Sequence, residues 1–476
     1  MKKVYLTAVL FLAVIFLIAF CGTAWAGYTT TKLTNNSNPY DDSYPQINNS
    51  GQVVWQGWDG ADYEIFLYSG GVTTQLTFNS YADAHPLINA SGQVVWTGKG
   101  PDGADEEIFL YSGGATSQLT SNSFNDVSPQ INASGQVAWY GSGPDGTDGE
   151  IFLYGGGVTI QITSNSYDDF SPQINASGQM VWTGNGPFYG TDGEIYLYSG
   201  GVTTALTSNN TSEGSPRIND SGQVAWQFHD GIDDEIYLYS GGLEGQITFN
   251  SHYDQLYKIS NSGQVYFGGN GLYVYSGGFN GQYTQLMATS YWVQINEGGQ
   301  MVWEKQGTYI YDQDWDIHLF SGGVATNLSN NYTNDYSPQI NDSGQVVWYG
   351  YDGTDYEIFL ASPCTEGRPE LSLSKANVYW ASYADYLVGK LIVNWRITNT
   401  GSIPAYNVNV TSSTNTNGVT INEPLPIIFG NIFEAGSGQD IKEVGWVHNI
   451  PAGVGSWQST LTGTAQDACG TTYTYP

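Results

Sequence analysis

The chain has 476 residues, too many for one ordinary hydrophobic core, so two or more domains are expected. Charged residues make up only 12%, while Gly (61) and Tyr (36) are abundant, which excludes a coiled coil or a charged disordered chain and favours turn-rich β structure. The formal net charge of −32, from 12 Lys plus Arg and 44 Asp plus Glu, excludes nucleic-acid binding by charge.

Residues 1–26 have the composition of a secretory signal peptide. Residues 1–3 are Met-Lys-Lys, residues 4–20 are almost wholly apolar, and residues 24–26 read Ala-Trp-Ala, a signal-peptidase pattern. We therefore expect a secreted protein, extracellular or periplasmic, with no stable membrane insertion. A single transmembrane anchor is the alternative, because about 17 apolar residues is close to the lower limit for a span. Cys21 follows a Phe rather than a small residue, which argues against lipid attachment.

A segment of the form Ile-Asn-x-Ser-Gly-Gln-Val-Val-Trp recurs about every 42 residues, the length of a four-stranded propeller blade. Its isoleucines are Ile47, Ile88, Ile131, Ile174, Ile218, Ile259, Ile295 and Ile340.

One repeat illustrates the four expected strands. They cover residues 128–132, 136–140, 150–154 and 158–163, separated by turn signals that include three consecutive glycines at 155–157. The middle strands are apolar on both faces, as expected for sheets packed between neighbours.

The eighth repeat ends after its third strand, near residue 361, whereas residues 29–34 match a fourth strand at the other end of the chain. We therefore expect an all-β protein with an eight-bladed β-propeller at residues 27–362, closed by its N-terminal strand, which removes two exposed sheet edges.

The repeat resembles the WD40-like repeat of TolB-type β-propellers. The run from Ile162 to Gln179, Ile-Thr-Ser-Asn-Ser-Tyr-Asp-Asp-Phe-Ser-Pro-Gln-Ile-Asn-Ala-Ser-Gly-Gln, carries the resemblance, together with Glu-Ile-Tyr-Leu-Tyr from Glu194 to Tyr198. That family usually has Trp-Ser-Pro-Asp-Gly where this chain has Ile-Asn-x-Ser-Gly. The resemblance covers residues 28–362 and implies a propeller that binds partners; it transfers no catalytic residue.

The repeat disappears from about Pro363, and residues 363–476 have the short alternating strands of a β-sandwich. The connection at residues 399–405, Asn-Thr-Gly-Ser-Ile-Pro-Ala, resembles that of bacterial immunoglobulin-like, cell-adhesion-related modules, which implies adhesion or spacing. Cys364 and Cys469 flank this segment and are expected to form a disulfide in an oxidising compartment. Two unpaired thiols are the alternative.

Most carboxylates fall in loops that share one face of the expected propeller. A recurring Asp-Gly-x-Asp-x-Glu pattern in the loop between the second and third strands supplies closely spaced oxygens, which suit Ca²⁺. The favoured alternative is that Asp and Gly only form the loop by capping its backbone amides. The candidate metal ligands are Asp59, Asp62, Glu64, Asp102, Asp105, Glu107, Asp145, Asp148, Glu150, Asp230, Asp233, Glu235, Asp312, Asp314, Asp316, Asp352, Asp355 and Glu357.

Seven tryptophans occupy one fixed place on the second strands, which favours packing between blades over ligand contact. Trp58, Trp292 and Trp315 fall outside that register, near the acidic loops, and are the candidates for ligand contact.

The sequence offers little enzyme chemistry. Its 5 histidines have no metal-ligand spacing, and there is no Gly-x-Ser-x-Gly elbow, phosphate-binding Gly loop or Cys-x-x-Cys. The expected function is therefore a secreted, non-catalytic binding or scaffold protein that recognises a protein or glycan through its acidic face. A hydrolase or lyase acting on an extracellular polymer is the alternative, and adhesion through residues 367–476 is a third possibility.

Overall fold

The computed structural model describes residues 27–475 except 37–40, 102, 144–145, 186–191, 289–292, 308–313, 330, 365–370, 401–404, 422–424, 426, 433–440, 453–458 and 467–471. The chain divides into two compact units, Thr30–Ser362 and Pro363–Pro476, the second of which takes in the residues up to Thr29. The expected signal peptide, residues 1–26, lies outside the described residues. Within the described part, every helix is too short or too polar to cross a bilayer.

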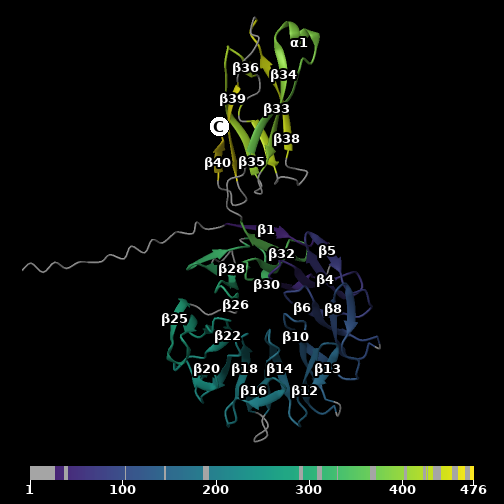
Figure 1. The fold of residues 1–476 in the computed structure, drawn as a ribbon, viewed down its shortest axis with the longest axis vertical. Coiled ribbons are helices and arrows are strands. Elements are labelled where there is room, and N and C mark those ends of the chain that lie inside the picture. The colour runs from purple at the N-terminus through teal and green to yellow at the C-terminus, as the bar shows by residue number, and fades with distance from the viewer. Residues whose placement is uncertain are drawn as a thin grey trace, which may run out of the picture. The chain divides into compact units, whose positions relative to one another are not determined.

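The structure is all-β, and the described strands between Tyr28 and Pro363 form eight four-stranded sheets around a common centre (Figure 1). We number these sheets by chain order. Sheet 1 contains β2 (Ser43–Ile47), β3 (Val53–Trp58), β4 (Tyr63–Ser69) and β5 (Val72–Gln75); sheet 2, β6 (Asp83–Ile88), β7 (Val94–Lys99), β8 (Glu106–Ser112) and β9 (Ala115–Gln118); sheet 3, β10 (Asp126–Ile131), β11 (Val137–Ser142), β12 (Gly149–Gly155) and β13 (Val158–Gln161); sheet 4, β14 (Asp169–Ile174), β15 (Met180–Asn185), β16 (Gly193–Ser199) and β17 (Val202–Ala205).

The remaining sheets of this unit continue the same order. Sheet 5 contains β18 (Glu213–Ile218), β19 (Val224–His229), β20 (Asp234–Ser240) and β21 (Leu243–Gln246); sheet 6, β22 (Gln255–Ile259), β23 (Val265–Gly268), β24 (Leu272–Ser276) and β25 (Gln282–Met287), with the 3-10 turn η1 (Gly278–Asn280); sheet 7, β26 (Val293–Ile295), β27 (Met301–Gln306), β28 (Trp315–Ser321) and β29 (Val324–Asn327); sheet 8, β30 (Asp335–Ile340), β31 (Val346–Tyr351), β32 (Tyr356–Pro363) and β1 (Tyr28–Lys32).

The second strands form the packed interior of this unit. In β11, Val137, Ala138 and Trp139 are all fully buried, so both faces of the strand meet neighbouring sheets. Gly156 and Gly157 have positive φ values of 60° and 84° and make the tight turn between β12 and β13. Two consecutive positive φ values are the geometry of a hairpin turn that matches strand twist, and glycine adopts them with little strain.

Six of the innermost strands, β2, β6, β10, β14, β18 and β30, share a β-bulge that the sequence did not predict. A residue before proline has a left-handed backbone there, and the strand register shifts at the same place. Proline disfavours the right-handed helical region for the residue before it, and an αL residue at a bulge re-aims the strand. These residues are Tyr44, His85, Ser128, Ser171, Ser215 and Ser337.

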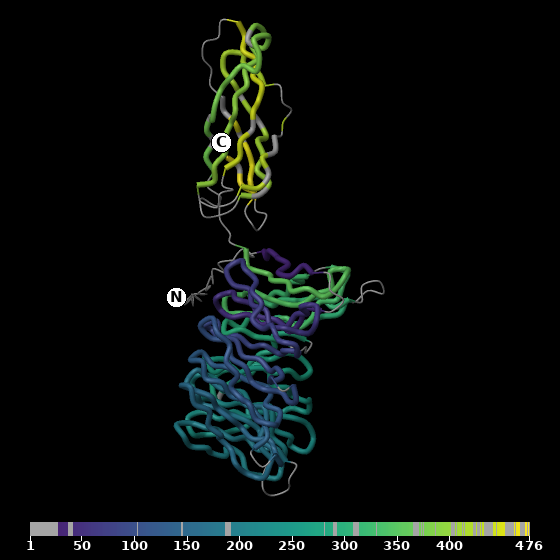
Figure 2. The backbone as a smooth tube through the Cα atoms, turned by 90° about the vertical axis from the view of Figure 1, so that its right-hand side faces the viewer, coloured from purple at the N-terminus to yellow at the C-terminus, as the bar shows by residue number. Residues whose placement is uncertain are grey.

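The strand β1 pairs with β32, more than 300 residues later in the chain, and Figure 2 shows the two side by side, β1 in purple and β32 in green. Leu33 donates its N–H to Ile358 O at 2.7 Å, and the hydroxyl of Thr34 accepts the Ile358 N–H at 2.9 Å. The N-terminal segment therefore supplies the fourth strand of sheet 8.

The asparagine of each Ile-Asn-x-Ser-Gly turn links one sheet to the next. Asn132 accepts the backbone N–H groups of Ser134 and Gln136 at its Oδ1, and its Nδ2 donates to Asn175 O of sheet 4 at 3.0 Å. Equivalent Nδ2 donors cross between sheets, and one of them joins sheet 8 to sheet 1. The other donor and acceptor pairs are Asn48 to Asn89, Asn89 to Asn132, Asn175 to Asn219, Asn219 to Ser260, Asn296 to Asn341 and Asn341 to Asn48.

In the second unit, the described strands form two further four-stranded sheets, whose order is β33-β34-β38-β36 and β37-β35-β39-β40. Side chains from both sheets share one core, in which Trp446 packs with Val408 and Leu461. The elements are β33 (Leu371–Tyr379), α1 (Tyr383–Leu387), β34 (Lys390–Asn399), β35 (Ala405–Asn415), β36 (Thr420–Ile421), β37 (Ile427–Ile432), β38 (Ile441–Asn449), β39 (Ser459–Gln466) and β40 (Thr472–Tyr475).

Candidate metal centre

The first aspartate of the Asp-Gly-x-Asp-x-Glu pattern shapes its own loop. In sheet 1, the Oδ1 of Asp59 accepts the Ala61 N–H at 2.8 Å, and the Asp59 N–H donates to Asp62 O at 3.1 Å. The glycine that follows, Gly60, has a φ of 114°, which an L side chain rarely adopts. Backbone capping by the first aspartate, one of the two readings of the sequence, is therefore confirmed for this residue.

The same loop geometry recurs in sheets 5 and 8. The Oδ1 of Asp230 accepts the Ile232 N–H, and the Oδ1 of Asp352 accepts the Thr354 N–H, both at 2.8 Å. These backbone hydrogen bonds lower the pKa of Asp230, because they favour the charged carboxylate.

The side chains of the second aspartate and the glutamate converge on the first carboxylate, whereas only the backbone of the second aspartate takes part in the loop turn. Among the described residues, three such groups have one carboxylate oxygen from each member within 4.8 Å of the others. The glutamates begin the third strands and are fully or almost fully buried. The groups are Asp59, Asp62 and Glu64 in sheet 1, Asp230, Asp233 and Glu235 in sheet 5, and Asp352, Asp355 and Glu357 in sheet 8.

The second aspartate of these groups lacks a hydrogen-bond donor at buried oxygen atoms. Both carboxylate oxygens of Asp233 and both of Asp355 are buried without a hydrogen-bond partner in the described structure, as is the Oδ1 of Asp62. Asp355 is only 3% exposed. A buried carboxylate oxygen that accepts no hydrogen bond is unfavourable, so these atoms are positioned to receive a cation.

Burial and mutual repulsion between the carboxylates raise pKa values within these groups. Burial, followed by repulsion from Asp59, raises the pKa of Asp62. Burial, with the charges of Asp83 and Asp62 adding to it, raises the pKa of Glu64 to about 7. A divalent cation between the three oxygens would reverse this repulsion.

Behind each acidic loop lies a second carboxylate that the sequence analysis did not single out. Asp83, the first residue of β6, is 1% exposed; its Oδ1 accepts the indole N–H of Trp96 at 3.0 Å and its Oδ2 accepts the Asn79 amide at 2.6 Å. The same three side chains repeat in sheets 3, 4 and 8, as Trp139, Asp126 and Asn122; Trp182, Asp169 and Asn165; and Trp348, Asp335 and Asn331. The recurring Asn-x-x-x-Asp spacing before each first strand was the available signal.

The fixed tryptophans therefore have two roles in packing. Each indole is buried to within 2% exposure and stacks on an aromatic ring of the third strand in several sheets, as Trp96 does on Phe109 with ring centroids 5.8 Å apart. In sheets 2, 3, 4 and 8 the indole N–H also donates to the buried carboxylate, so these tryptophans are hydrogen-bond donors as well as apolar contacts.

The other predicted ligands do not form such groups within the described residues. In sheet 7, Asp316 accepts hydrogen bonds from Asn327 and Ser329, which satisfy its oxygens. Asp102, Asp145 and Asp312 lie outside the described residues. Asp105, Glu107, Asp148, Glu150 and Asp314 are described, and their role as ligands stays a prediction.

The remaining candidates keep their status as predictions. Trp58 and Trp315 are half-buried at the loop ends of β3 and β28, and Trp292 lies outside the described residues. Cys364 is buried, whereas Cys469 lies outside the described residues, so the disulfide is a prediction still.

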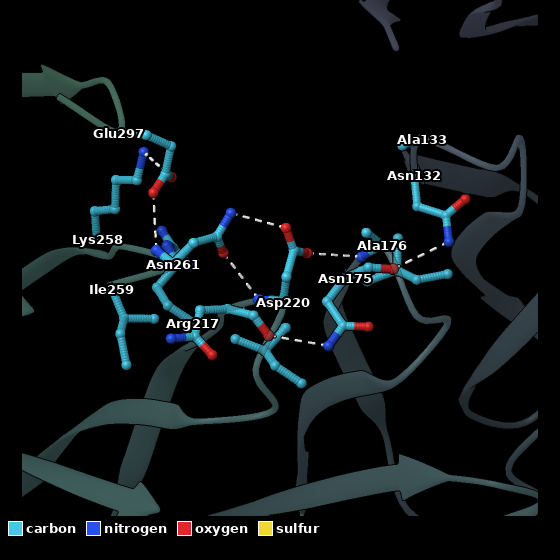
Figure 3. A pocket seen from close by; sticks show the side chains of 13 residues that line it. Asn132, Ala133, Asn175, Ala176, Arg217, Asp220, Lys258, Ile259, Asn261 and Glu297 are labelled. Atoms are coloured by element: carbon cyan, nitrogen blue, oxygen red, sulfur yellow. Dashed lines mark hydrogen bonds and ion pairs between the residues drawn. The ribbon is translucent and has the colours of Figure 1, made fainter. Parts of the chain in front are cut away.

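At the other end of the innermost strands lies a pocket of about 350 Å³, lined by the Asn-x-Ser-Gly turns (Figure 3). Figure 3 shows its carboxylates already engaged. Asp220 accepts from Asn261 at 2.8 Å and from the Ala176 N–H at 2.9 Å, while Glu297 pairs with Lys258 at 2.7 Å. These acids are satisfied within the protein, in contrast to those of the opposite loops.

Comparisons with known proteins give structural likeness only. No protein-family model matches the sequence, and no curated protein matches it. The β-propeller domain of the Trilobed protease from Pyrococcus furiosus is similar, with 13% identity and a TM-score of 0.43, over 61% of this chain and 99% of that one.

Two further solved structures show the range of these neighbours. Dipeptidyl peptidase 4 from Porphyromonas gingivalis has 11% identity and a TM-score of 0.45, over 66% of this chain and 58% of that one. TolB from Acinetobacter baumannii has 14% identity and a TM-score of 0.33, over 59% of this chain and 79% of that one.

These neighbours correct the functional prediction. The sequence predicted a binding or scaffold protein without enzyme activity. A hydrolase or lyase acting on an extracellular polymer was the alternative. Peptidases recur among the similar structures, so the prediction of a non-catalytic protein was wrong. The likeness concerns the propeller fold and assigns no catalytic role to any residue here.

Proposed function

We propose that this chain is an exported, TolB-like β-propeller of eight blades that binds Ca²⁺ at the loops between the second and third strands of sheets 1 and 5, followed by an immunoglobulin-like β-sandwich. The eight four-stranded sheets and the hydrogen bonds from sheet 8 to sheet 1 support the closed ring. The shared core of the two C-terminal sheets supports the sandwich. The basic and apolar N-terminal residues with Ala-Trp-Ala support export.

One observation carries the calcium proposal. In sheet 5, Asp233 has two buried oxygens without a hydrogen-bond donor, and carboxylate oxygens of Asp230 and Glu235 lie within 4.8 Å of it. The loop does not need Asp233 for its turn, because Asp230 caps the backbone there. A buried, unpaired carboxylate that serves no structural contact is explained by a cation.

The donor set favours Ca²⁺ over other metals. All three donors are carboxylate oxygens, which suit hard cations, whereas Zn²⁺ and the later transition metals prefer nitrogen or sulfur ligands. Ca²⁺ takes six to eight oxygens in flexible geometry, so loop carbonyls and water can complete the shell. Mg²⁺ requires near-ideal octahedral geometry, which an irregular group of three carboxylates does not supply by itself.

The affinity follows from the class of site. Open extracellular Ca²⁺ sites have dissociation constants of about 10⁻⁴ to 10⁻³ M. At 5 mM Ca²⁺ and a dissociation constant of about 10⁻⁴ M, each site stabilises the folded unit by about 2 kcal/mol.

The test is calorimetric titration of the full mature chain with CaCl₂ after removal of metal by chelator. We expect heat of binding, with the number of sites falling by one in Asp233→Asn and by two in Asp62→Asn/Asp233→Asn. Glu106→Gln is the matched control, because Glu106 is an exposed carboxylate on the same set of loops and belongs to none of the groups. An absence of heat, with no change of melting temperature between Ca²⁺ and chelator, would overturn the proposal.

A further inference from the structure

The carboxylate group of sheet 8 differs from the other two because it already contains a cation. The Lys32 ammonium lies 2.5 Å from the Oδ2 of Asp352 and 3.0 Å from the Oε1 of Glu357. Glu357 has no exposed side-chain surface, whereas the Lys32 side chain keeps 26% exposure. The ammonium therefore contacts two of the three carboxylates that define this group.

Lys32 reaches the group from the N-terminal strand, whereas the matching residues of sheets 1 and 5 are glutamines. Leu33 donates to Ile358 O as Leu76 does to Ile65 O, so Lys32 corresponds to Gln75. The amide of Gln75 donates away from the group, to Thr77 O at 2.8 Å, and Gln246 donates to Thr248 O at 2.7 Å. Sheets 1 and 5 thus have no ammonium at this place.

We propose that the Lys32 ammonium takes the place of the metal ion in sheet 8, so that β1 is locked to β32 without Ca²⁺, while the equivalent groups of sheets 1 and 5 take Ca²⁺. The proposal rests on the calcium function proposed above and names which of the three groups the metal does not occupy. Among the described strands of this unit, only β1 joins a sheet whose other strands lie at the far end of the unit's sequence.

Other contacts tie the N-terminal segment to the same group. The Asn36 N–H donates to the Oε1 of Glu357 at 3.1 Å, and the Asn36 side chain donates to Asp42 at 2.9 Å. Burial, with the charges of Glu357 and Asp355 adding to it, raises the pKa of Asp42 to about 7. The segment around Lys32 thus lies among several acids that a positive charge stabilises.

A lysine serves this position better than a metal because the first and last strands of the propeller unit meet there. The strand β1 comes from the beginning of the unit and must pair with β32 at its end. The Lys32 ammonium is part of β1, so it is always present at this position, whatever the Ca²⁺ concentration. At an affinity of about 10⁻⁴ to 10⁻³ M, a metal would leave the closure partly open in calcium-poor surroundings. A bonded ion pair at a half-buried position is also screened less by salt than an exposed one.

The experiment compares Lys32→Gln, which installs the residue of sheets 1 and 5, with Lys32→Arg, which keeps the charge. In chelator, Lys32→Gln is expected to melt roughly 4 to 7 °C below the wild type, because it leaves Asp352 and Glu357 without a cation. Ca²⁺ at 5 mM should restore most of this loss, and titration should count one more Ca²⁺ site than in the wild type. Lys32→Arg should bind as many Ca²⁺ ions as the wild type does.

The outcomes separate this inference from the calcium function itself. A wild type that binds Ca²⁺, beside a Lys32→Gln protein that gains no site and is not rescued, overturns the role of Lys32 alone. If the wild type binds no Ca²⁺ but Lys32→Gln binds one ion, the proposed Ca²⁺ sites of sheets 1 and 5 are overturned. The role of Lys32 in sheet 8 is then still supported. If neither protein binds Ca²⁺, both proposals fail. Asp352→Asn is a second test in case Lys32→Gln does not fold. Because the inference places no Ca²⁺ in sheet 8, this variant should bind as many Ca²⁺ ions as the wild type, and the loss of one site would contradict the inference.

Discussion

Replacing Asn132 by alanine removes a link between two neighbouring sheets and a turn cap at once. Asn132 is 5% exposed, and its side chain donates to Asn175 O at 3.0 Å and to the Oε1 of Gln136 at 2.9 Å. Its Oδ1 also accepts the backbone N–H groups of Ser134 and Gln136 at 3.1 and 2.9 Å. The Oδ1 also accepts the Ser134 hydroxyl at 2.8 Å, so five hydrogen bonds depend on one short side chain.

The expected loss of stability follows from those bonds. Each contributes about 0.5 to 1.5 kcal/mol net, and the buried carbonyl of Asn175 loses a donor, so Asn132→Ala should cost about 3 kcal/mol. In a unit as large as Thr30–Ser362, 1 kcal/mol moves the melting temperature by roughly 1.5 °C, which predicts a fall of about 4 to 5 °C.

Sheet 6 supplies the matched control, since it has Ser260 where the other turns have asparagine. The Ser260 hydroxyl accepts the Gln264 N–H at 3.1 Å and so keeps a turn cap, but it does not reach the next sheet. Asn132→Ser should therefore lose the link to Asn175 while keeping part of the cap, and should cost about half as much as alanine. Differential scanning calorimetry of the full chain measures both. A cost below about 1 kcal/mol for alanine, or equal costs for the two variants, would refute this account of the turn.

Two further predictions concern buried carboxylates. In chelator, the propeller unit should lose stability as the pH rises from about 4.5 to 7. Glu64 and Glu213 have pKa values of about 7 in the folded protein, against 4.5 for the free side chain. In this pH range the folded protein therefore holds protons that the unfolded chain releases. At about 1.4 kcal/mol per pKa unit each contributes a few kcal/mol to this loss, which melting temperatures from pH 5 to 8 would measure, and a flat or rising profile would contradict it. Gly141→Ala should destabilise by about 1 to 3 kcal/mol, because a Cβ at this position meets the buried Oδ1 of Asp126, whereas Ser142→Ala beside it should change urea unfolding by less than about 0.5 kcal/mol.

The strands were predictable because each repeat contains turn-forming residues between its strands. The expected strand at residues 136–140 overlaps β11, that at 150–154 lies within β12, and that at 29–34 overlaps β1, which pairs with β32 as the matching of repeats predicted. Alternating apolar residues predict strands and paired glycines predict hairpin turns. Both signals lie within a few residues of the element they predict, so they can be recognised in the sequence alone. The left-handed residues before proline were not predicted, because their conformation is set by the bulge in the pairing with the second strand.

The candidate site was predictable only in part. The Asp-Gly spacing indicated the loops, and the capping role of Asp59 follows from local chemistry. The contact of Lys32 with Asp352 joins residues 320 positions apart, so no local pattern contains it. The buried Asp83 reads as one more loop acid in the sequence, because its tryptophan partner lies 13 residues away on the next strand.

The asparagine links have a consequence for how such a chain grows. Except at sheet 6, each turn meets its neighbour through the same amide and carbonyl, so the contact does not identify which unit stands beside it. Duplication or loss of a whole unit in the gene would therefore leave the remaining junctions matched. The junction within sheet 8 is different, because the ammonium of Lys32 near the beginning of the unit contacts Asp352 and Glu357 near its end, so a rearranged unit would have to keep both partners.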